Sequence, residues 1–155
     1  MQPDAGQNAT AKGAPDRSHK GSLMPEMTFS DPEGRKLRLA DLKGQPVLIN
    51  LWATWCAGCL AELPQLNKLA ASGFRVVTIS QDMQQLERVP EFLRARGGPD
   101  LEAWLDPQSE LSFHYGSGAL PTTLLYDSAG REVWRVVGER DWLDKQSQQL
   151  LAEAE

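Results

Sequence analysis

The sequence predicts an α/β protein in which a central mixed β-sheet is flanked by helices. Two patterns carry this prediction. Residues 46–80 read as strand, helix, strand, and their two apolar runs are continuous enough for parallel strands covered on both faces. Residues 123–152 read as two paired strands followed by a helix. A length of 155 residues predicts one such domain.

The amino-terminal segment shows no apolar periodicity and is rich in small and polar residues. We expect residues 1–24 to form a flexible tether and residues 25–155 to form the folded domain. No run approaches the ~18 apolar residues of a membrane span, and no apolar signal-peptide segment is present. Tethers of this kind often follow a removed signal peptide or a membrane anchor; a merely ragged terminus is the alternative.

Two short strands open the expected domain. They span residues 27–30 and 36–39, and the turn residues 31–34, Asp-Pro-Glu-Gly, predict that they form a β-hairpin. The apolar run 46–52 follows, and its nearly unbroken aliphatic character predicts a central strand.

A helix is expected directly after this strand, because leucines recur at helical spacing up to the stop signal Ser72-Gly73. Pro64 lies inside the pattern and should kink the helix. Residues 74–80 then form the next buried strand, parallel to the first through a right-handed crossover.

Helical connections are expected before the closing strand pair. A helix over residues 83–96 is interrupted at Pro90, a short strand covers residues 101–105, and Asp106-Pro107 is a favoured helix start. The last elements are a strand at 123–126, a turn at 127–130, a strand at 132–137 and a helix at 141–152.

The composition is that of a soluble globular domain, with 41% hydrophobic and 24% charged residues. The formal net charge is −5, which disfavours binding to a polyanion. We therefore expect no nucleic-acid partner.

The chain has two cysteines, Cys56 and Cys59, in a C-x-x-C spacing. A structural disulfide framework needs more cysteines at more distant positions, so this pair serves reactivity or metal binding. Zinc requires four ligands, and the only histidines are the distant His19 and His114. The sequence therefore predicts a redox pair and no metal site.

The predicted position of the pair makes Cys56 the reactive member. It falls where a buried strand ends and a helix begins, so unpaired N–H groups and the helix dipole should stabilise its thiolate. Cys59 lies one turn further along the same face and should be more buried and protonated. Cys56 would attack a partner disulfide, and Cys59 would resolve the mixed disulfide.

The motif Trp52-Ala53-Thr54-Trp55-Cys56-x-x-Cys59, with Leu120-Pro121-Thr122 downstream, resembles the thioredoxin superfamily. More narrowly it is similar to the TlpA/ResA group of extracytoplasmic, often membrane-tethered, thiol–disulfide oxidoreductases. The resemblance covers about residues 25–155. It implies a thioredoxin-like fold with an amino-terminal β-hairpin and an insertion before a cis-proline element.

The resemblance also implies roles for individual residues. Trp55 would shield the active-site sulfur and form part of the docking face, with plain packing as the alternative. Pro121 would be a cis-proline that leaves the Leu120 backbone free to pair with an extended substrate segment, unless it is an ordinary trans residue at a strand start. Glu62 would take the proton of Cys59, unless it is a solvated surface glutamate.

Three features depart from the pattern. Asn50 stands where cytoplasmic thioredoxin has a buried aspartate, which leaves Glu62 as the leading proton acceptor. The dipeptide Ala57-Gly58 lacks the usual proline, which leaves the reducing strength open. Thr122 replaces an acidic residue typical of the cytochrome-maturation branch, which favours the broader TlpA/ResA type.

The sequence therefore predicts a monomeric, cofactor-free dithiol reductase in the periplasm or on an outer membrane face. The resemblance implies partner proteins with cysteine pairs, such as apocytochrome c or copper-site assembly proteins, and a membrane thiol–disulfide electron donor. A copper or partner chaperone on the same fold is the alternative. A peroxidase on the related peroxiredoxin fold is a third reading. Such enzymes need a proline and a threonine ahead of the reacting cysteine; here Thr54 lies only two residues before Cys56, and the preceding Pro46 lies far upstream.

Overall fold

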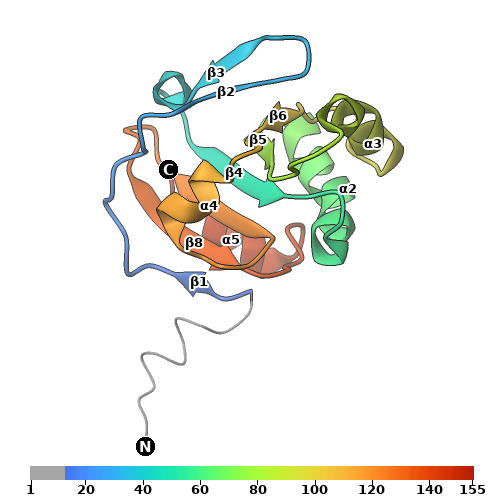
Figure 1. Cartoon of the computed structure of the whole chain (residues 1–155). Helices are drawn as coiled ribbons and strands as arrows, with labels where there is room; N and C mark the ends of the chain where they lie inside the picture. Colours follow the sequence, from blue (N-terminus) through green and yellow to red (C-terminus); the bar gives the residue numbers. More distant parts are fainter. Residues whose placement is uncertain (1–12) are drawn as a thin grey trace, which may run out of the picture.

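The computed structural model describes residues 13–155, which form one eight-stranded mixed sheet flanked by helices (Figure 1). The strand order is β1-β8-β7-β4-β5-β6-β2-β3. The strands are β1 (Pro15–Asp16), β2 (Thr28–Ser30), β3 (Lys36–Arg38), β4 (Val47–Trp52), β5 (Arg75–Ser80), β6 (Trp104–Leu105), β7 (Thr122–Tyr126) and β8 (Glu132–Val137).

Strand β4 lies inside the sheet, and all six of its residues are buried. It pairs in parallel with β5, from Val47 opposite Arg75 to Trp52 opposite Ser80. On its other side it pairs antiparallel with β7, which continues into β8 through a hairpin. The strand–helix–strand unit and the closing strand pair of the sequence prediction are both confirmed.

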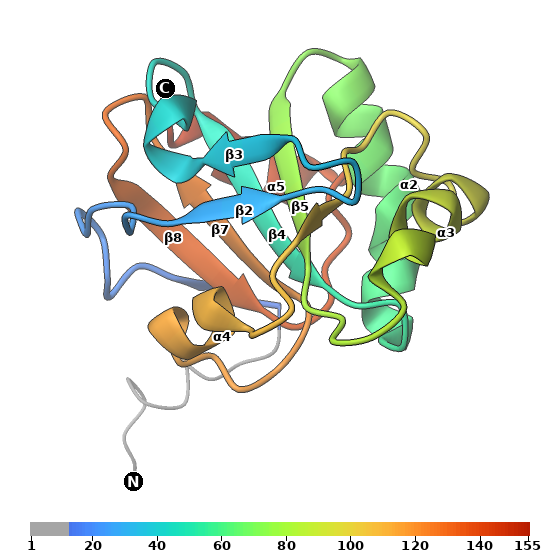
Figure 2. The ribbon, with the colours of Figure 1, turned by 45° about the horizontal axis from the view of Figure 1, so that its top comes forward.

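The expected amino-terminal hairpin is formed by β2 and β3, with Phe29 opposite Leu37 (Figure 2). Strand β2 joins the sheet through β6, where Ser30 pairs with Leu105. The hairpin therefore extends the sheet beyond β6, at the edge opposite β1.

Alternation along β4 gives the sheet two cores. Leu48 and Trp52 belong to one core, which takes in α2 (Ala57–Ala71), α3 (Val89–Ala95) and α5 (Lys145–Ala152). Ile49 and Leu51 belong to the other, which takes in the 3-10 helix η1 (Leu39–Leu42), α4 (Glu110–Tyr115) and the β2–β3 hairpin. Both faces of the sheet are thus covered, as the apolar run in β4 predicts.

Three helices start later than the sequence predicts: α3, α4 and α5. Residues 83–85 are not helical, since Gln85 has a φ of +54°, and the segment continues as η2 (Leu86–Arg88) and α3. Helix α4 starts at Glu110 rather than at Pro107, although the Asp106 carboxylate still accepts hydrogen bonds from the N–H groups of Glu110 and Leu111. Helix α5 begins at Lys145 because the side chain of Asp144 caps it.

The folded unit starts earlier than residue 25. Pro15 of β1 pairs with Val136, the N–H of Gly13 donates to the carbonyl of Val137 at 2.9 Å, and Met24 is buried. For residues 13–24 the expectation of a flexible tether is therefore wrong; residues 1–12 lie outside the described part of the chain. A two-residue strand has no apolar periodicity to reveal it.

A buried polar cluster fastens α4 to the sheet. Arg135 of β8 makes two hydrogen bonds to Glu132, at 2.6 and 2.7 Å, and a third to the carbonyl of Tyr115 at the end of α4. The hydroxyls of Tyr115 and Tyr126 lie 2.7 Å apart, and burial raises the pKa of Tyr126 to about 12. The tyrosines are therefore neutral at physiological pH, and α4 is held by a fully paired network.

Replacing Gly97 with alanine is expected to destabilise the chain by about 2–3 kcal/mol. Gly97 follows α3 with a φ of +96°, and a Cβ there would lie 2.9 Å from Cγ of Pro64, a rigid ring inside α2. Chemical denaturation measures the loss. The matched control is Gly34→Ala, because Gly34 has a φ of +88° and nothing within 4 Å of the Cβ position. Equal losses in the two variants would show that the contact with Pro64 costs nothing.

Candidate active site around Cys56 and Cys59

The two cysteines form a disulfide at the start of α2. Cys56 is the helix N-cap in an extended conformation, and its Sγ accepts a hydrogen bond from the N–H of Cys59 at 3.2 Å. Cys56 is 9% exposed and Cys59 is 1% exposed. In the reduced pair, this N–H group and the positive end of the helix dipole favour a thiolate at Cys56.

Two residues of the predicted docking face lie beside the pair. Trp55 is 71% exposed, which argues against the alternative that it only packs in the core. The Leu120–Pro121 bond is cis, and Cδ of Pro121 lies 3.5 Å from the position that a Cβ of Gly58 would occupy. Within the described part of the chain, neither backbone polar group of Leu120 takes part in a backbone hydrogen bond. That segment is therefore available for pairing with a partner strand.

Glu62 is fully buried in α2, one turn after Cys59 on the same helix face. This burial contradicts the alternative that Glu62 is a solvated surface residue. Its carboxyl accepts hydrogen bonds from the N–H of Arg140 at 2.8 Å and from Nδ2 of Asn50 at 3.4 Å. Burial raises the pKa of Glu62 to about 8; the Arg140 N–H opposes this shift, and the charge of nearby Glu139 adds to it. In this oxidised state the carboxyl therefore holds a proton at neutral pH.

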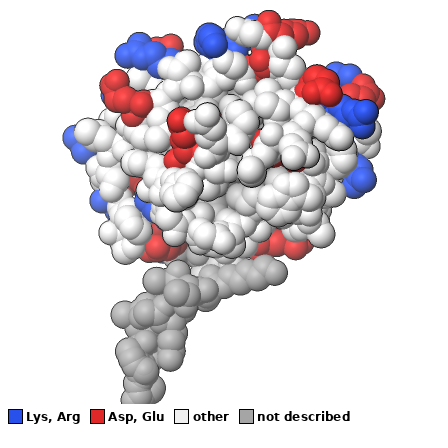
Figure 3. All heavy atoms as spheres, viewed as in Figure 1, with Lys and Arg blue, Asp and Glu red and all other residues white. Residues whose placement is uncertain are grey.

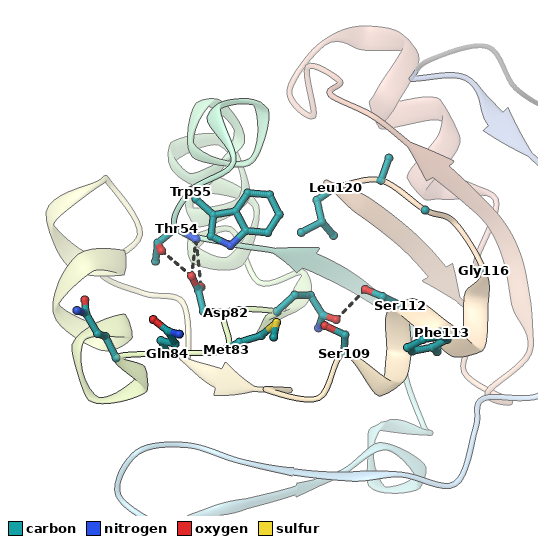
Figure 4. A pocket seen from close by; sticks show the side chains of 14 residues that line it. Thr54, Trp55, Asp82, Met83, Gln84, Ser109, Ser112, Phe113, Gly116 and Leu120 are labelled. Atoms are coloured by element: carbon teal, nitrogen blue, oxygen red, sulfur yellow. Dashed lines mark hydrogen bonds between the residues drawn. The ribbon is translucent and has the colours of Figure 1, made fainter.

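Asp82 positions the turn that leads into Cys56, a role that the sequence reasoning missed. The buried carboxylate accepts hydrogen bonds from the N–H of Thr54 and from the Thr54 hydroxyl, the latter at 2.6 Å (Figure 4). It also accepts one from the Ser80 hydroxyl at 2.6 Å. The contact with Thr54 joins residues 28 positions apart, so no local motif reveals it. The available signal was the place of Asp82 just beyond the carboxyl end of a buried strand, where binding residues collect in α/β sheets.

Glu139 was also missed. Its Oε1 would lie 3.3 Å from a Cβ at position 58, so the glycine between the cysteines leaves room for this exposed carboxylate. The missing proline of the C-x-x-C turn therefore coincides with an acidic side chain that lies close against this position.

A groove of about 990 Å³ opens beside the pair. In Figure 4 Trp55 and Leu120 lie on one side of it, and Met83, Ser109 and Phe113 lie on the other. Its lining comes from the turn before Cys56, the segment after β5, α4 and the loop before Pro121: Thr54, Trp55, Gln81, Asp82, Met83, Gln84, Gln85, Ser109, Ser112, Phe113, Gly116, Gly118, Ala119 and Leu120.

Residues 13–155 contain neither a side-chain group suited to a metal ion nor a helix suited to a membrane span. No three of their His, Cys, Asp and Glu side chains are grouped so as to hold a metal ion. None of the helices in this range combines the length and the apolar character needed to cross a bilayer.

Comparison with known proteins gives consistent matches. A family model described as the AhpC/TSA family matches residues 21–133. The thiol-disulfide oxidoreductase ResA of Bacillus anthracis is 32% identical over 124 residues, covering 77% of this chain and 70% of the relative. The thiol:disulfide interchange protein DsbE of Vibrio cholerae is 32% identical over 142 residues, covering 86% and 77%.

The solved structures that resemble this chain include proteins of the same kind. A crystal structure from Chlorobium tepidum, assigned as a thiol:disulfide interchange protein DsbE, superposes with a TM-score of 0.74 at 29% identity, covering 88% of this chain and 98% of the other. The exposed lipoprotein thioredoxin of Streptococcus pneumoniae has a TM-score of 0.67 at 28% identity, covering 83% and 99%.

Proposed function

We propose a dithiol reductase function for this chain, which belongs to the AhpC/TSA family and is a thiol–disulfide oxidoreductase with a thioredoxin-like fold. The observation that carries the proposal is the hydrogen bond from the N–H of Cys59 to Sγ of Cys56 at the start of α2. It places one sulfur where a thiolate is stabilised and leaves the other, less exposed, to act second.

In the proposed reaction the reduced pair gives two electrons to a partner disulfide. The Cys56 thiolate attacks one partner sulfur, so that the partner's S–S bond breaks, its other sulfur leaves as a thiolate, and a mixed disulfide forms. Cys59 then loses its proton and attacks Sγ of Cys56, which releases the second partner sulfur. The chain ends as the Cys56–Cys59 disulfide and the partner ends reduced.

Glu62 is the group that we assign to the proton of Cys59. Its carboxylate takes this proton when Cys59 attacks, and its carboxylic acid returns the proton when an electron donor reopens the disulfide and Cys59 leaves. Burial raises the pKa of Glu62 to about 8, so once the disulfide has formed the carboxyl can hold the proton that it has taken.

The partners that fit this site are proteins with cysteine pairs, docked against Trp55 and the Leu120 backbone. We place the reaction outside the cytoplasm, supported by the similarity to an exposed lipoprotein thioredoxin. The proposal has four further parts. The substrates are apocytochrome c or copper-site assembly proteins, and the electron donor is a membrane thiol–disulfide protein. The chain is a monomer and is attached through its amino terminus. These details rest on the resemblance to the TlpA/ResA group.

Equilibrium titration of the full chain against glutathione buffers tests the reductase proposal. We expect one reversible two-electron transition, with a potential nearer to the about −270 mV of thioredoxin than to the about −120 mV of a strong oxidant. A potential at the oxidising end would contradict the direction proposed. One tightly held copper or zinc ion per reduced chain would support the chaperone alternative, and rapid consumption of hydrogen peroxide would support a peroxidase.

A further inference from the structure

We propose that the groove beside the redox pair binds the uncharged, extended segment that flanks the reacting cysteine of the partner, with Phe113 of α4 as the main contact. This inference rests on the proposed reductase function and adds a sequence preference to it. The partner is thus expected to present apolar side chains next to its cysteine.

Exposed hydrophobic side chains are concentrated at this groove. The large hydrophobic residues that are exposed in the described chain are Leu23, Trp55, Met83 and Phe113, at 60%, 71%, 73% and 85%. All but Leu23 line the groove. Large apolar side chains gathered on one open surface mark an interaction site, because they otherwise gain nothing from exposure to water.

The groove offers no charge to a bound partner. Apart from Asp82 its lining is apolar or neutral, with glutamine, serine and threonine as the polar residues. Asp82 is buried, and its oxygens already accept hydrogen bonds from Thr54 and Ser80. In Figure 3 the lower middle of this face is largely white, with red atoms above it. A charged side chain entering the groove would lose water without gaining an opposite charge.

The groove adjoins the redox pair: Trp55 and Leu120 line it, although neither cysteine does. Trp55 precedes Cys56, and Leu120, whose backbone polar groups make no backbone bond in the described chain, precedes the cis-proline. A strand that pairs with Leu120 would lead from the disulfide into the groove. A volume of about 990 Å³ is at the upper end of what ligand sites usually enclose, so several side chains fit. The occupant is therefore the segment next to the partner's cysteine.

The helix that carries Phe113 is fixed to the rest of the fold before any partner arrives. Helix α4 is fastened at its end by the Arg135 bond to the carbonyl of Tyr115 and on its groove side by the Ser112 hydroxyl, which donates to Oε1 of Gln81 at 2.7 Å. The side chain is thus presented on a rigid element, and binding it costs little reorganisation.

Stopped-flow oxidation of the reduced chain tests the proposal. The substrates are a peptide disulfide with leucine and phenylalanine beside the cysteine, the same peptide with aspartate and lysine there, and the small neutral 2-hydroxyethyl disulfide. We expect the apolar peptide to react about tenfold faster than the charged one. In Phe113→Gln the ratio of the apolar-peptide rate to the small-disulfide rate should fall about tenfold, since a partly buried phenylalanine contact is lost.

The matched control is Leu23→Gln, which removes the one exposed large hydrophobic side chain of residues 13–155 that lies outside the groove. The ratio should stay unchanged in this variant and should recover in Phe113→Leu. An equal fall in Leu23→Gln, no fall in Phe113→Gln, or equal rates for the two peptides would overturn the proposal. So would a dimer of the wild-type chain that Phe113→Gln dissolves, because a second copy would then fill the groove. A chain that reacts with none of the disulfides would instead disprove the reductase function.

Discussion

Serine at position 59 is expected to stop the reaction at the mixed disulfide, and serine at position 56 is expected to abolish it. Sγ of Cys56 is the sulfur that receives the N–H bond at the helix start, so only this sulfur is prepared to attack a partner. Without Cys59 the attack still occurs, but no second thiol is at hand to release the partner. Mass spectrometry of each reduced variant after mixing with a peptide disulfide measures the outcome.

Each serine variant is the control for the other, since both lose one thiol from the same turn of chain. Cys59→Ser should gain the mass of one peptide thiol, and Cys56→Ser should gain none on the same timescale. If Cys56→Ser formed the adduct while Cys59→Ser stayed free, the two roles would have to be exchanged.

Glu62→Gln is expected to slow opening of the disulfide by an added dithiol donor about a hundredfold near pH 7. The glutamine keeps the shape and can still accept the Arg140 N–H, but it has no proton to give to the leaving sulfur of Cys59. In the wild-type chain the rate, corrected for the ionisation of the donor, should fall as the pH rises through about 8, where Glu62 loses its proton. This decline should be absent in Glu62→Gln.

Glu139→Gln is the matched control for this pH profile. The charge of Glu139 raises the pKa of Glu62, so removing it should move the decline to lower pH and leave the decline itself in place. A decline that persists unchanged in Glu62→Gln would show that another group supplies the proton.

The same carboxyl makes the stability of the oxidised chain depend on pH. The pKa of Glu62 rises from 4.5 to about 8 on folding, so the folded chain holds a proton that the unfolded chain releases. The free energy of unfolding should therefore be highest, for this group, below about pH 4.5 and fall as the pH rises through about 8, by a few kcal/mol. Urea denaturation of wild type and Glu62→Gln across this range should show a steeper fall for the wild type.

The strongly patterned parts of the fold could be predicted from the sequence. The run 46–52 has no polar residue but Asn50, and such a segment has few alternatives to a central strand. The start of α4 differs from the prediction at Asp106-Pro107. Asp106 does accept a hydrogen bond from the first N–H group of the helix, but it lies in the loop before Glu110, where the helix begins. Strand β1 is held by backbone bonds to β8, which leave no mark on side-chain pattern.

The residues of the site likewise divide into those that the sequence pattern reveals and those that only the structure reveals. Cys56 and Cys59 can be identified from the sequence by their spacing and by their place after a strand. The prediction for Glu62 came from the family resemblance, and its burial became visible only in the structure. Asp82 and Glu139 reach the cysteine turn from loops that the fold brings close, so neither could be found by reading along the chain.

The short outer strands of the sheet have a consequence for the solubility of the protein. An open β-strand edge is a template for aggregation, because its unpaired N–H and carbonyl groups can add a strand from another molecule. Here one edge ends in β1, which is two residues long, and the other ends in β3, which exposes the cationic side chains of Lys36 and Arg38. Within residues 13–155, neither border gives a neighbouring molecule a long, uncharged ladder to extend, so both edges are poor templates for aggregation.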